Sequence, residues 1–179
     1  VTCAVLQALV NRGLQVGAFK CGPDYIDPMF HSRVIGAKAR NLDLHFFSEN
    51  TLRCLLAQNA ADRDVSVIEG VMGYYDGAGL TSEKASSYEV AQVSRTPVVL
   101  VVNARGAALS LLPVIQGFLH FRASSGIRGV ILNQCTAMTY GALKPCIEAQ
   151  CGIRCYGFLP RVAEAEVGSR HLGLITADE

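Results

Sequence analysis

The sequence has 179 residues, of which 50% are hydrophobic and 17% charged, and its formal net charge is +1. This length is typical of one domain with a real core. The near-neutral charge, without any basic run, argues against a nucleic-acid partner, and no apolar stretch reaches the roughly 18 residues of a membrane span. The 7 cysteines in a chain rich in apolar residues favour reduced, buried thiols and a cytoplasmic location.

The first part of the chain predicts two helices and two buried strands around a charged loop. A helix over 1–9 ends near Gly13 and is followed by a strand over 14–19 and a loop over 20–31, which Pro23 and Pro28 stiffen. The segment over 34–43 is ambiguous, and its residues 41–43 form a loop. A helix then runs from its N-cap Ser48 to about 61, and a strand follows over 65–68.

The second part of the chain continues the alternation of strands and helices. A glycine-rich loop over 69–77 is followed by a helix that Ser87 caps and that ends near 94. A strand over 97–102, a helix over 108–122 and a strand over 130–132 come next. The last elements are a helix within 140–150, which is kinked or begins at Pro145, and a strand over 155–158. This alternation predicts an α/β fold, a mostly parallel sheet with helices on both faces, and one domain over residues 1–179.

Charged and polar side chains follow several of the predicted strands. They are Lys20 with Asp24 and Asp27, Glu69 with Asp76, and Asn133. Because the carboxyl ends of parallel strands lie on one edge of a sheet, we expect these side chains to converge there. Carboxylates that hold Mg²⁺ beside phosphate oxygens suit phosphoryl transfer. The sequence therefore predicts a site for a charged substrate, phosphate and metal.

A phosphate-binding loop normally lies between a first strand and the first helix. The sequence opens with Val1 inside its first predicted helix, just after the place where such a loop would stand. We therefore expect the chain to be a fragment, truncated before its first helix, with the P-loop strand outside it.

Three segments together resemble the cobyrinate a,c-diamide synthase family. They are Lys20-Cys21-Gly22-Pro23-Asp24-Tyr25-Ile26-Asp27-Pro28 followed by His31, Glu69-Gly70-Val71-Met72-Gly73-Tyr74-Tyr75-Asp76-Gly77, and Arg170-His171-Leu172-Gly173-Leu174. Supporting matches are Arg40-Asn41-Leu42-Asp43, Val130-Ile131-Leu132-Asn133 and Gly157-Phe158-Leu159-Pro160. The resemblance covers essentially the whole chain and corresponds to the family's amino-terminal synthetase domain, a P-loop NTPase of the dethiobiotin-synthetase-like type.

The resemblance implies an amidoligase that uses ATP and Mg²⁺. Members activate the a and c acetate carboxylates of a corrinoid as acyl phosphates, and ammonia released from glutamine displaces the phosphate. The ammonia normally comes from a carboxyl-terminal glutamine amidotransferase domain, which we expect to lie outside this chain. We expect no nucleic-acid or membrane partner, and a homodimer stays open.

Roles for single residues also follow from the resemblance alone. Glu69 would ligate Mg²⁺, and Asp24 would help bind the metal or order the phosphoryl-transfer site. Lys20 would neutralise phosphate charge, and Asp27 and Asp76 would stabilise ammonia or hold the loops closed. Tyr25, Ile26, Tyr75, Arg170 and His171 would contact the corrinoid, and Asn133 would read adenine. The sequence departs from the family pattern at Cys21, where valine is common, and at Asn103, where we expect aspartate.

Alternatives remain for several of these residues. Asp24 and Asp27 also suit a turn beside prolines, and Tyr74 and Tyr75 suit packing of a wall. His31 and His171 are interpreted as donors that order loops, because acyl-phosphate formation needs no general base on an ionised carboxylate. Arg170 suits either a substrate carboxylate or a pair with Glu166, and Cys146, Cys151 and Cys155 suit core packing better than a metal site.

Two other functions compete with this interpretation. A related enzyme would amidate a nickel-bound sirohydrochlorin instead of a corrinoid. A non-catalytic module would keep the fold and bind the ring or the nucleotide without turnover. The missing P-loop and Asn103 favour the module, whereas the joint presence of Lys20, Asp24, Asp27, Glu69 and Asp76 argues against it.

Overall fold

The computed structural model describes residues 1–162 of the chain. These residues form two compact units, Val1–Arg95 and residues 96–162. Each unit has its own three-stranded parallel sheet. Within residues 1–162, no helix is both long and apolar enough to cross a membrane.

The sheet of the first unit has the strand order β2-β1-β3, with β1 (Val16–Cys21) in the centre, β2 (Lys38–Leu42) on one side and β3 (Val65–Glu69) on the other. All six residues of β1 are buried. A central strand that is covered on both faces needs a nearly continuous run of small and apolar residues, and Lys20 is the exception in this run. β1 therefore carries a buried cation into the core of the unit.

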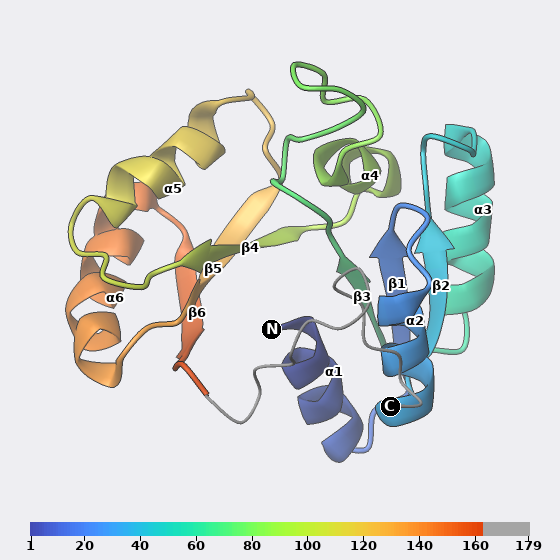
Figure 1. Cartoon of the computed structure of the whole chain (residues 1–179), viewed down its shortest axis with the longest axis horizontal. Coiled ribbons are helices and arrows are strands. Elements are labelled where there is room, and N and C mark those ends of the chain that lie inside the picture. The colour runs from blue at the N-terminus through green and yellow to red at the C-terminus, as the bar shows by residue number, and fades with distance from the viewer. Residues whose placement is uncertain (163–179) are drawn as a thin grey trace, which may run out of the picture. The chain divides into compact units, whose positions relative to one another are not determined.

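Helices cover both faces of this sheet (Figure 1). They are α1 (Thr2–Asn11), α2 (Ile26–Met29), the π-helical turn η1 (Phe30–Val34), α3 (Glu49–Ala60) and α4 (Ser87–Ser94). On one face, Leu6 of α1 packs with Val16 and Ala18. On the other face, Leu52 of α3 and Val90 of α4 pack with a second set of strand residues that includes Phe19, Cys21 and Leu42. Alternate residues of each strand thus belong to different cores.

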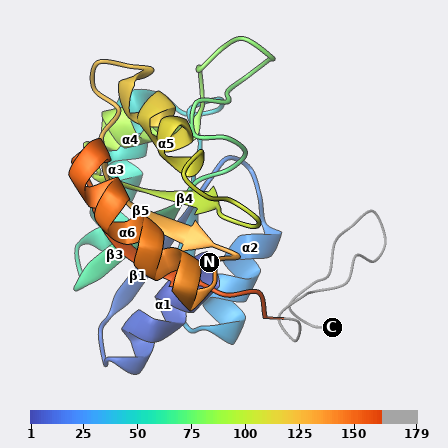
Figure 2. The same cartoon turned by 90° about the vertical axis from the view of Figure 1, so that its left-hand side faces the viewer.

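The sheet of the second unit has the order β4-β5-β6, with β4 (Val98–Asn103), β5 (Ile127–Asn133) and β6 (Arg154–Leu159). Its helices α5 (Leu111–His120) and α6 (Ala137–Cys151) pack against each other, and they lie together in front of the strands in Figure 2. Leu100 and Val102 of β4 are buried, whereas Val99 and Val101 are nearly half exposed. One face of this strand is therefore covered and the other is open.

The α/β class and the alternation of parallel strands and helices are confirmed. In place of one sheet, however, the backbone hydrogen bonds define two sheets of three strands each. The prediction of helices on both faces holds for the first unit, whereas α5 and α6 of the second unit lie side by side.

Several predicted boundaries were wrong. Lys20 and Cys21 belong to strand β1, and the segment predicted as a loop up to His31 contains α2 and η1. Asn41 and Leu42 belong to β2 instead of a loop, and Ser86, not Ser87, caps α4. The helix α6 begins at Ala137 and runs through Pro145. Backbone hydrogen bonds with neighbouring strands keep Lys20, Cys21, Asn41 and Leu42 extended, although some of these residues are polar.

Candidate functional site

Three polar residues form a row across the carboxyl ends of the first sheet. Lys20 of β1 is the register partner of Asn41 on β2 and of Glu69 on β3. Register partners on parallel strands present their side chains to the same face. Lys20 is two residues beyond Ala18, so this is the face that α1 covers. The row therefore combines a cation, an amide and a carboxylate at one edge of the sheet.

Lys20 lies at the centre of an acidic group. Its ammonium Nζ donates a hydrogen bond to Asp27 Oδ2 at 2.5 Å and lies 3.7 Å from Glu69 Oε2 and 3.8 Å from Asp24 Oδ2. The side chain is only 7% exposed. A buried ammonium is tolerated only when carboxylates surround it. Lys20 therefore needs the segment that carries Asp24 and Asp27 to fold over it.

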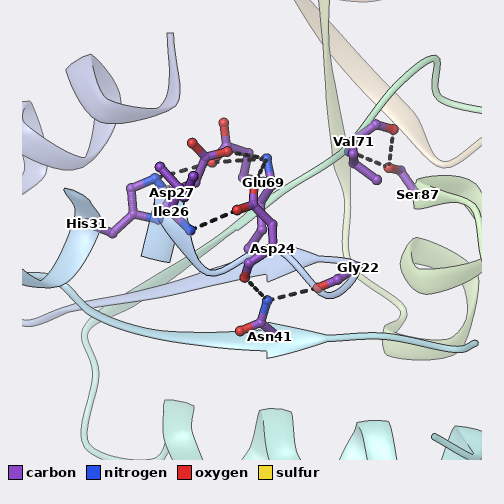
Figure 3. Close-up of polar contacts among 10 residues, drawn as sticks. Gly22, Asp24, Ile26, Asp27, His31, Asn41, Glu69, Val71 and Ser87 are labelled. Carbon is purple, nitrogen blue, oxygen red and sulfur yellow. Dashed lines mark hydrogen bonds and ion pairs between the residues drawn. The ribbon is translucent and has the colours of Figure 1, made fainter. Parts of the chain in front are cut away.

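Asn41 fastens that segment to the sheet. Its side-chain Nδ2 donates to the backbone carbonyl of Gly22 at 2.8 Å and also to the carbonyl of Asp24, as Figure 3 shows. The Asp24 carboxylate Oδ1 in turn accepts a hydrogen bond from the backbone N–H of Ile26 at 2.8 Å, at the start of α2. These contacts fix the chain that leaves β1 and turn Asp24 and Asp27 toward the ammonium.

His31 of η1 completes the group. Its ring is 1% exposed, and its Nε2 lies 3.2 Å from Glu69 Oε2 (Figure 3). No hydrogen bond of the ring is well aligned, and its polar neighbours include Cys3 as well as the Glu69 carboxylate. Three carboxylates therefore surround two basic side chains, Lys20 and His31.

The charges of this group stabilise one another. Burial alone lowers the pKa of Lys20, but the hydrogen bond to Asp27 and the charge of Glu69 raise it above its usual value. Burial likewise opposes ionisation of Asp27 and Glu69, yet Lys20 and His31 lower the pKa of both carboxyls. For His31, burial favours the neutral ring, and the neighbouring Cys3 and Glu69 raise its pKa to about 9. Lys20 and His31 are therefore charged at neutral pH.

The carboxylates around Lys20 suit Mg²⁺ better than a metal ion that takes all of its ligands from protein side chains. Within the part of the chain described, no three His, Cys, Asp or Glu side chains are grouped to hold a metal ion. Mg²⁺ usually takes one or two carboxylates and fills its shell with water and phosphate oxygens. Glu69 and Asp24 could supply these two carboxylates, and the three carboxylates against two cations leave one net negative charge.

Asp76 lies in the glycine-rich loop that follows β3 and folds back onto that loop. Its carboxylate Oδ2 accepts a hydrogen bond from the backbone N–H of Gly73 at 2.9 Å. A Cβ at Gly73 would lie 2.3 Å from the same oxygen, so a larger residue there would displace the Asp76 carboxylate from this contact. Asp76 thus contacts its own loop, and its predicted convergence with Asp24 and Asp27 stays a prediction.

The aromatic candidates have different surroundings. Tyr25 precedes α2 and is 66% exposed, so its ring is available to a ligand. Tyr75 instead contacts the rings of Tyr74 and Tyr88, with centroids 4.8 Å and 5.1 Å away. Tyr74 is buried, so these rings form part of a packed wall. Ile26 is half-buried at the start of α2.

The other candidates lie outside the first unit or outside the described residues. Asn133 ends β5 in register with Asn103 of β4. The side chain of Asn103 accepts a hydrogen bond from the backbone N–H of Arg105 at 3.0 Å and so shapes the turn after β4. Arg170 and His171 lie outside the residues that the structure describes.

Two members of the site were not among the predicted functional residues, namely His31 and Asn41. His31 was interpreted as ordering a loop, and its position beside Glu69 depends on η1, which the sequence did not predict. Asn41 was placed in a loop, and the only signal in the sequence for β2 was the partial alternation of polar and apolar residues over Lys38–Leu42.

Comparisons with known proteins identify relatives of this chain. No protein-family profile matches the chain. The chain is 41% identical over 148 residues to a cobyrinate a,c-diamide synthase of Clostridium acetobutylicum, which covers 83% of this chain and 33% of the relative. It is 40% identical over 179 residues to the protein of that name from Thermoplasma volcanium and 38% identical over 180 residues to the one from Salmonella typhimurium, each match covering 39% of the relative.

The match to the Thermoplasma protein covers 99% of this chain and the match to the Salmonella protein covers 100%, so these two include every described element. The chain itself spans about two fifths of the length of these relatives. The chain belongs to the cobyrinate a,c-diamide synthase family.

Proposed function

We propose that the protein containing this chain amidates the a and c acetate carboxylates of cobyrinate or hydrogenobyrinate, with ATP and glutamine-derived ammonia, in cobalamin biosynthesis. The observation that carries the proposal is the group around Lys20, which assembles three carboxylates at the carboxyl ends of parallel strands. The names of the curated relatives support the same activity. In this proposal the chain is the synthetase domain, and the P-loop and glutamine amidotransferase domain lie outside it.

The reaction begins when a substrate carboxylate attacks the γ-phosphorus of ATP. This forms an acyl phosphate and releases ADP. Ammonia then attacks the acyl carbon, phosphate leaves, and the amide remains after loss of a proton. Both steps concentrate negative charge at phosphate oxygens, so catalysis rests largely on positioning and charge neutralisation.

The described residues support distinct roles in this reaction. Glu69 and Asp24 would hold Mg²⁺, which supplies charge neutralisation at the phosphates. Lys20 keeps Asp27 and Glu69 ionised by lowering their pKa, so both stay anionic at neutral pH. Asp27 is 41% exposed at its side chain and so is available to ammonium or to a closing loop.

Substrate recognition is the second part of the proposal. Tyr25 has an exposed ring beside the acidic group and suits contact with a large planar macrocycle. We assign Ile26 and Tyr75 to the same substrate-binding surface. Because the Tyr75 ring contacts two neighbouring rings, only the edge of that ring is assigned to the substrate contact. Asn133 would read adenine, and Asp76, Arg170 and His171 keep the roles that the resemblance implies.

The test uses the complete gene product that contains this sequence. It is incubated with Mg-ATP, glutamine and cobyrinic acid, and the products are read by mass spectrometry. Corrinoid diamide with a matching amount of ADP is the expected result. If cobyrinic acid is unchanged but nickel-sirohydrochlorin is amidated, the proposed macrocycle is wrong, whereas the proposed amidation reaction is right. If neither ring reacts, a binding module replaces the ligase.

A substitution at Glu69 tests the site itself. Glu69→Gln removes a metal-ligating charge, and we expect turnover to fall by about 100-fold or more while the protein stays folded. Glu49→Gln is the matched control, because Glu49 is an exposed residue of α3 that pairs with Arg53 of the same helix. Near-normal turnover of Glu69→Gln with unchanged Mg²⁺ dependence would exclude Glu69 from the metal site.

A further inference from the structure

The ring of His31 is buried without satisfying its polar atoms. It is 1% exposed, neither ring nitrogen makes an aligned hydrogen bond, and its polar neighbours include the Glu69 carboxylate and Cys3. Burying a polar group without a partner costs free energy, so such a group in a native fold calls for a reason. A side chain that only ordered a loop would donate a hydrogen bond to that loop.

The carboxylate of Glu69 accounts for the free-energy cost of burying the His31 ring. His31 Nε2 lies 3.2 Å from Glu69 Oε2, and Lys20 Nζ lies 3.7 Å from the same oxygen. This oxygen is also fully buried and has no aligned hydrogen bond. One carboxylate oxygen of Glu69 is thus held between two basic groups that come from different elements, β1 and η1.

The backbone fixes the position of His31 independently of Glu69. The carbonyl of His31 accepts a hydrogen bond from the N–H of Ala37 at 2.8 Å, and the Ser32 hydroxyl accepts one from the N–H of Ala39 in β2 at 3.1 Å. These two bonds tie the π-helical turn to the sheet. Single π-helical turns are frequent at functional sites, where they re-aim one side chain.

We propose that His31 is a positioning residue, which together with Lys20 holds Oε2 of Glu69 so that Glu69 meets the metal through Oε1. The proposal rests on the role of Glu69 as a metal ligand in the function proposed above. Groups behind a metal ligand commonly fix its orientation in this way, and loss of one changes metal affinity by about 10-fold or more. The present Nε2 contact is long for a hydrogen bond and would tighten once Oε1 is engaged, as site contacts often do.

The test must separate orientation from charge, because removing a cation near a metal site also favours metal binding. His31→Gln and His31→Met are both neutral and have unbranched side chains of similar length. Only glutamine keeps an N–H donor near the position of Nε2. Any effect of lost charge is therefore shared by both variants, and the difference between them reports the donor.

The assay is titration of the complete, metal-free protein with Mn²⁺, with free Mn²⁺ measured by electron paramagnetic resonance. We expect the dissociation constant for Mn²⁺ to be about 10-fold weaker for His31→Met than for His31→Gln. The Mg²⁺ concentration that half-saturates ATP turnover should shift in the same order. His45 is an exposed histidine outside the group, and its Gln and Met variants should bind Mn²⁺ equally.

Equal Mn²⁺ affinity of folded His31→Gln and His31→Met would overturn the proposal. If His31→Gln fails to fold, imidazole added to His31→Ala replaces it, because the added ring restores a donor near the position of Nε2, and unchanged Mn²⁺ affinity on its addition would overturn the proposal. Glu69→Gln separates this inference from the proposed function. If Glu69→Gln weakens Mn²⁺ binding and the His31 pair does not differ, only the role of His31 fails. If Glu69→Gln leaves Mn²⁺ binding unchanged, the metal assignment fails and the inference with it.

Discussion

Replacing Lys20 tests whether the acidic group depends on one buried cation. Lys20→Met keeps an unbranched side chain of similar length but leaves Asp24, Asp27 and Glu69 as neighbouring like charges. Breaking a fully buried ion pair costs about 3 to 5 kcal/mol, whereas an exposed pair contributes about 0 to 1 kcal/mol. Lys20 is 7% exposed at its side chain and Asp27 is 41% exposed. We therefore expect a loss of about 2 kcal/mol, between these two cases.

A double-mutant cycle isolates the Lys20–Asp27 contact. Asp27→Asn removes one carboxylate charge, so the double variant should be more stable than the sum of the two single losses predicts. The 2.5 Å hydrogen bond between charged groups indicates a coupling of about 1 to 2 kcal/mol. Hydrogen exchange of peptides from β1 and β3, followed by mass spectrometry in the complete protein, measures these local free energies.

The matched control is Lys38→Met, because Lys38 is an exposed lysine of the neighbouring strand β2. It should change the exchange of β1 and β3 by less than about 0.5 kcal/mol. The reasoning would be refuted if the stability loss of the double variant equalled the sum of the losses of Lys20→Met and Asp27→Asn within about 0.3 kcal/mol. Such a result would mean that solvent screens this ion pair as it screens a surface contact.

Further predictions concern pH and packing. The pKa of His31 is raised from 6.5 to about 9 in the folded protein, so without metal its contribution to stability is complete below pH 6.5 and is lost as the pH rises through 9. The slope should be at most about 1.4 kcal/mol per pH unit, and an equal slope in His31→Gln would contradict it. Gly129→Ala should destabilise the second unit by about 2 kcal/mol or more, because a Cβ there would lie 2.7 Å from the Arg154 carbonyl. Gly141→Ala in α6, where a Cβ has open space, is the control and should be neutral or stabilising in thermal unfolding. Ser48→Ala should cost about 1 kcal/mol in the exchange of α3, because the Ser48 hydroxyl accepts the Thr51 N–H; unchanged exchange would show that the cap is dispensable.

The class of the fold and the sites of most helices could be predicted from the sequence. Apolar runs such as that before Lys20 are typical of covered parallel strands, and Ser48 signals a helix start by chemistry that acts within three residues. The acidic residues near the strand ends also indicated the site, because the edge of a parallel sheet brings such ends together. These inferences succeeded because their causes are local in the chain or follow from topology.

The tertiary structure alone decided how those residues are joined. Lys20 and Asn41 appeared to lie in loops, yet ladder hydrogen bonds with strands far away in sequence hold both in the sheet. His31 became a neighbour of Glu69 because η1 turns it inward, and Asp76 bonded its own loop. Local propensity is worth only a few tenths of a kcal/mol per residue, so long-range pairing and the burial of charge override it wherever the two disagree.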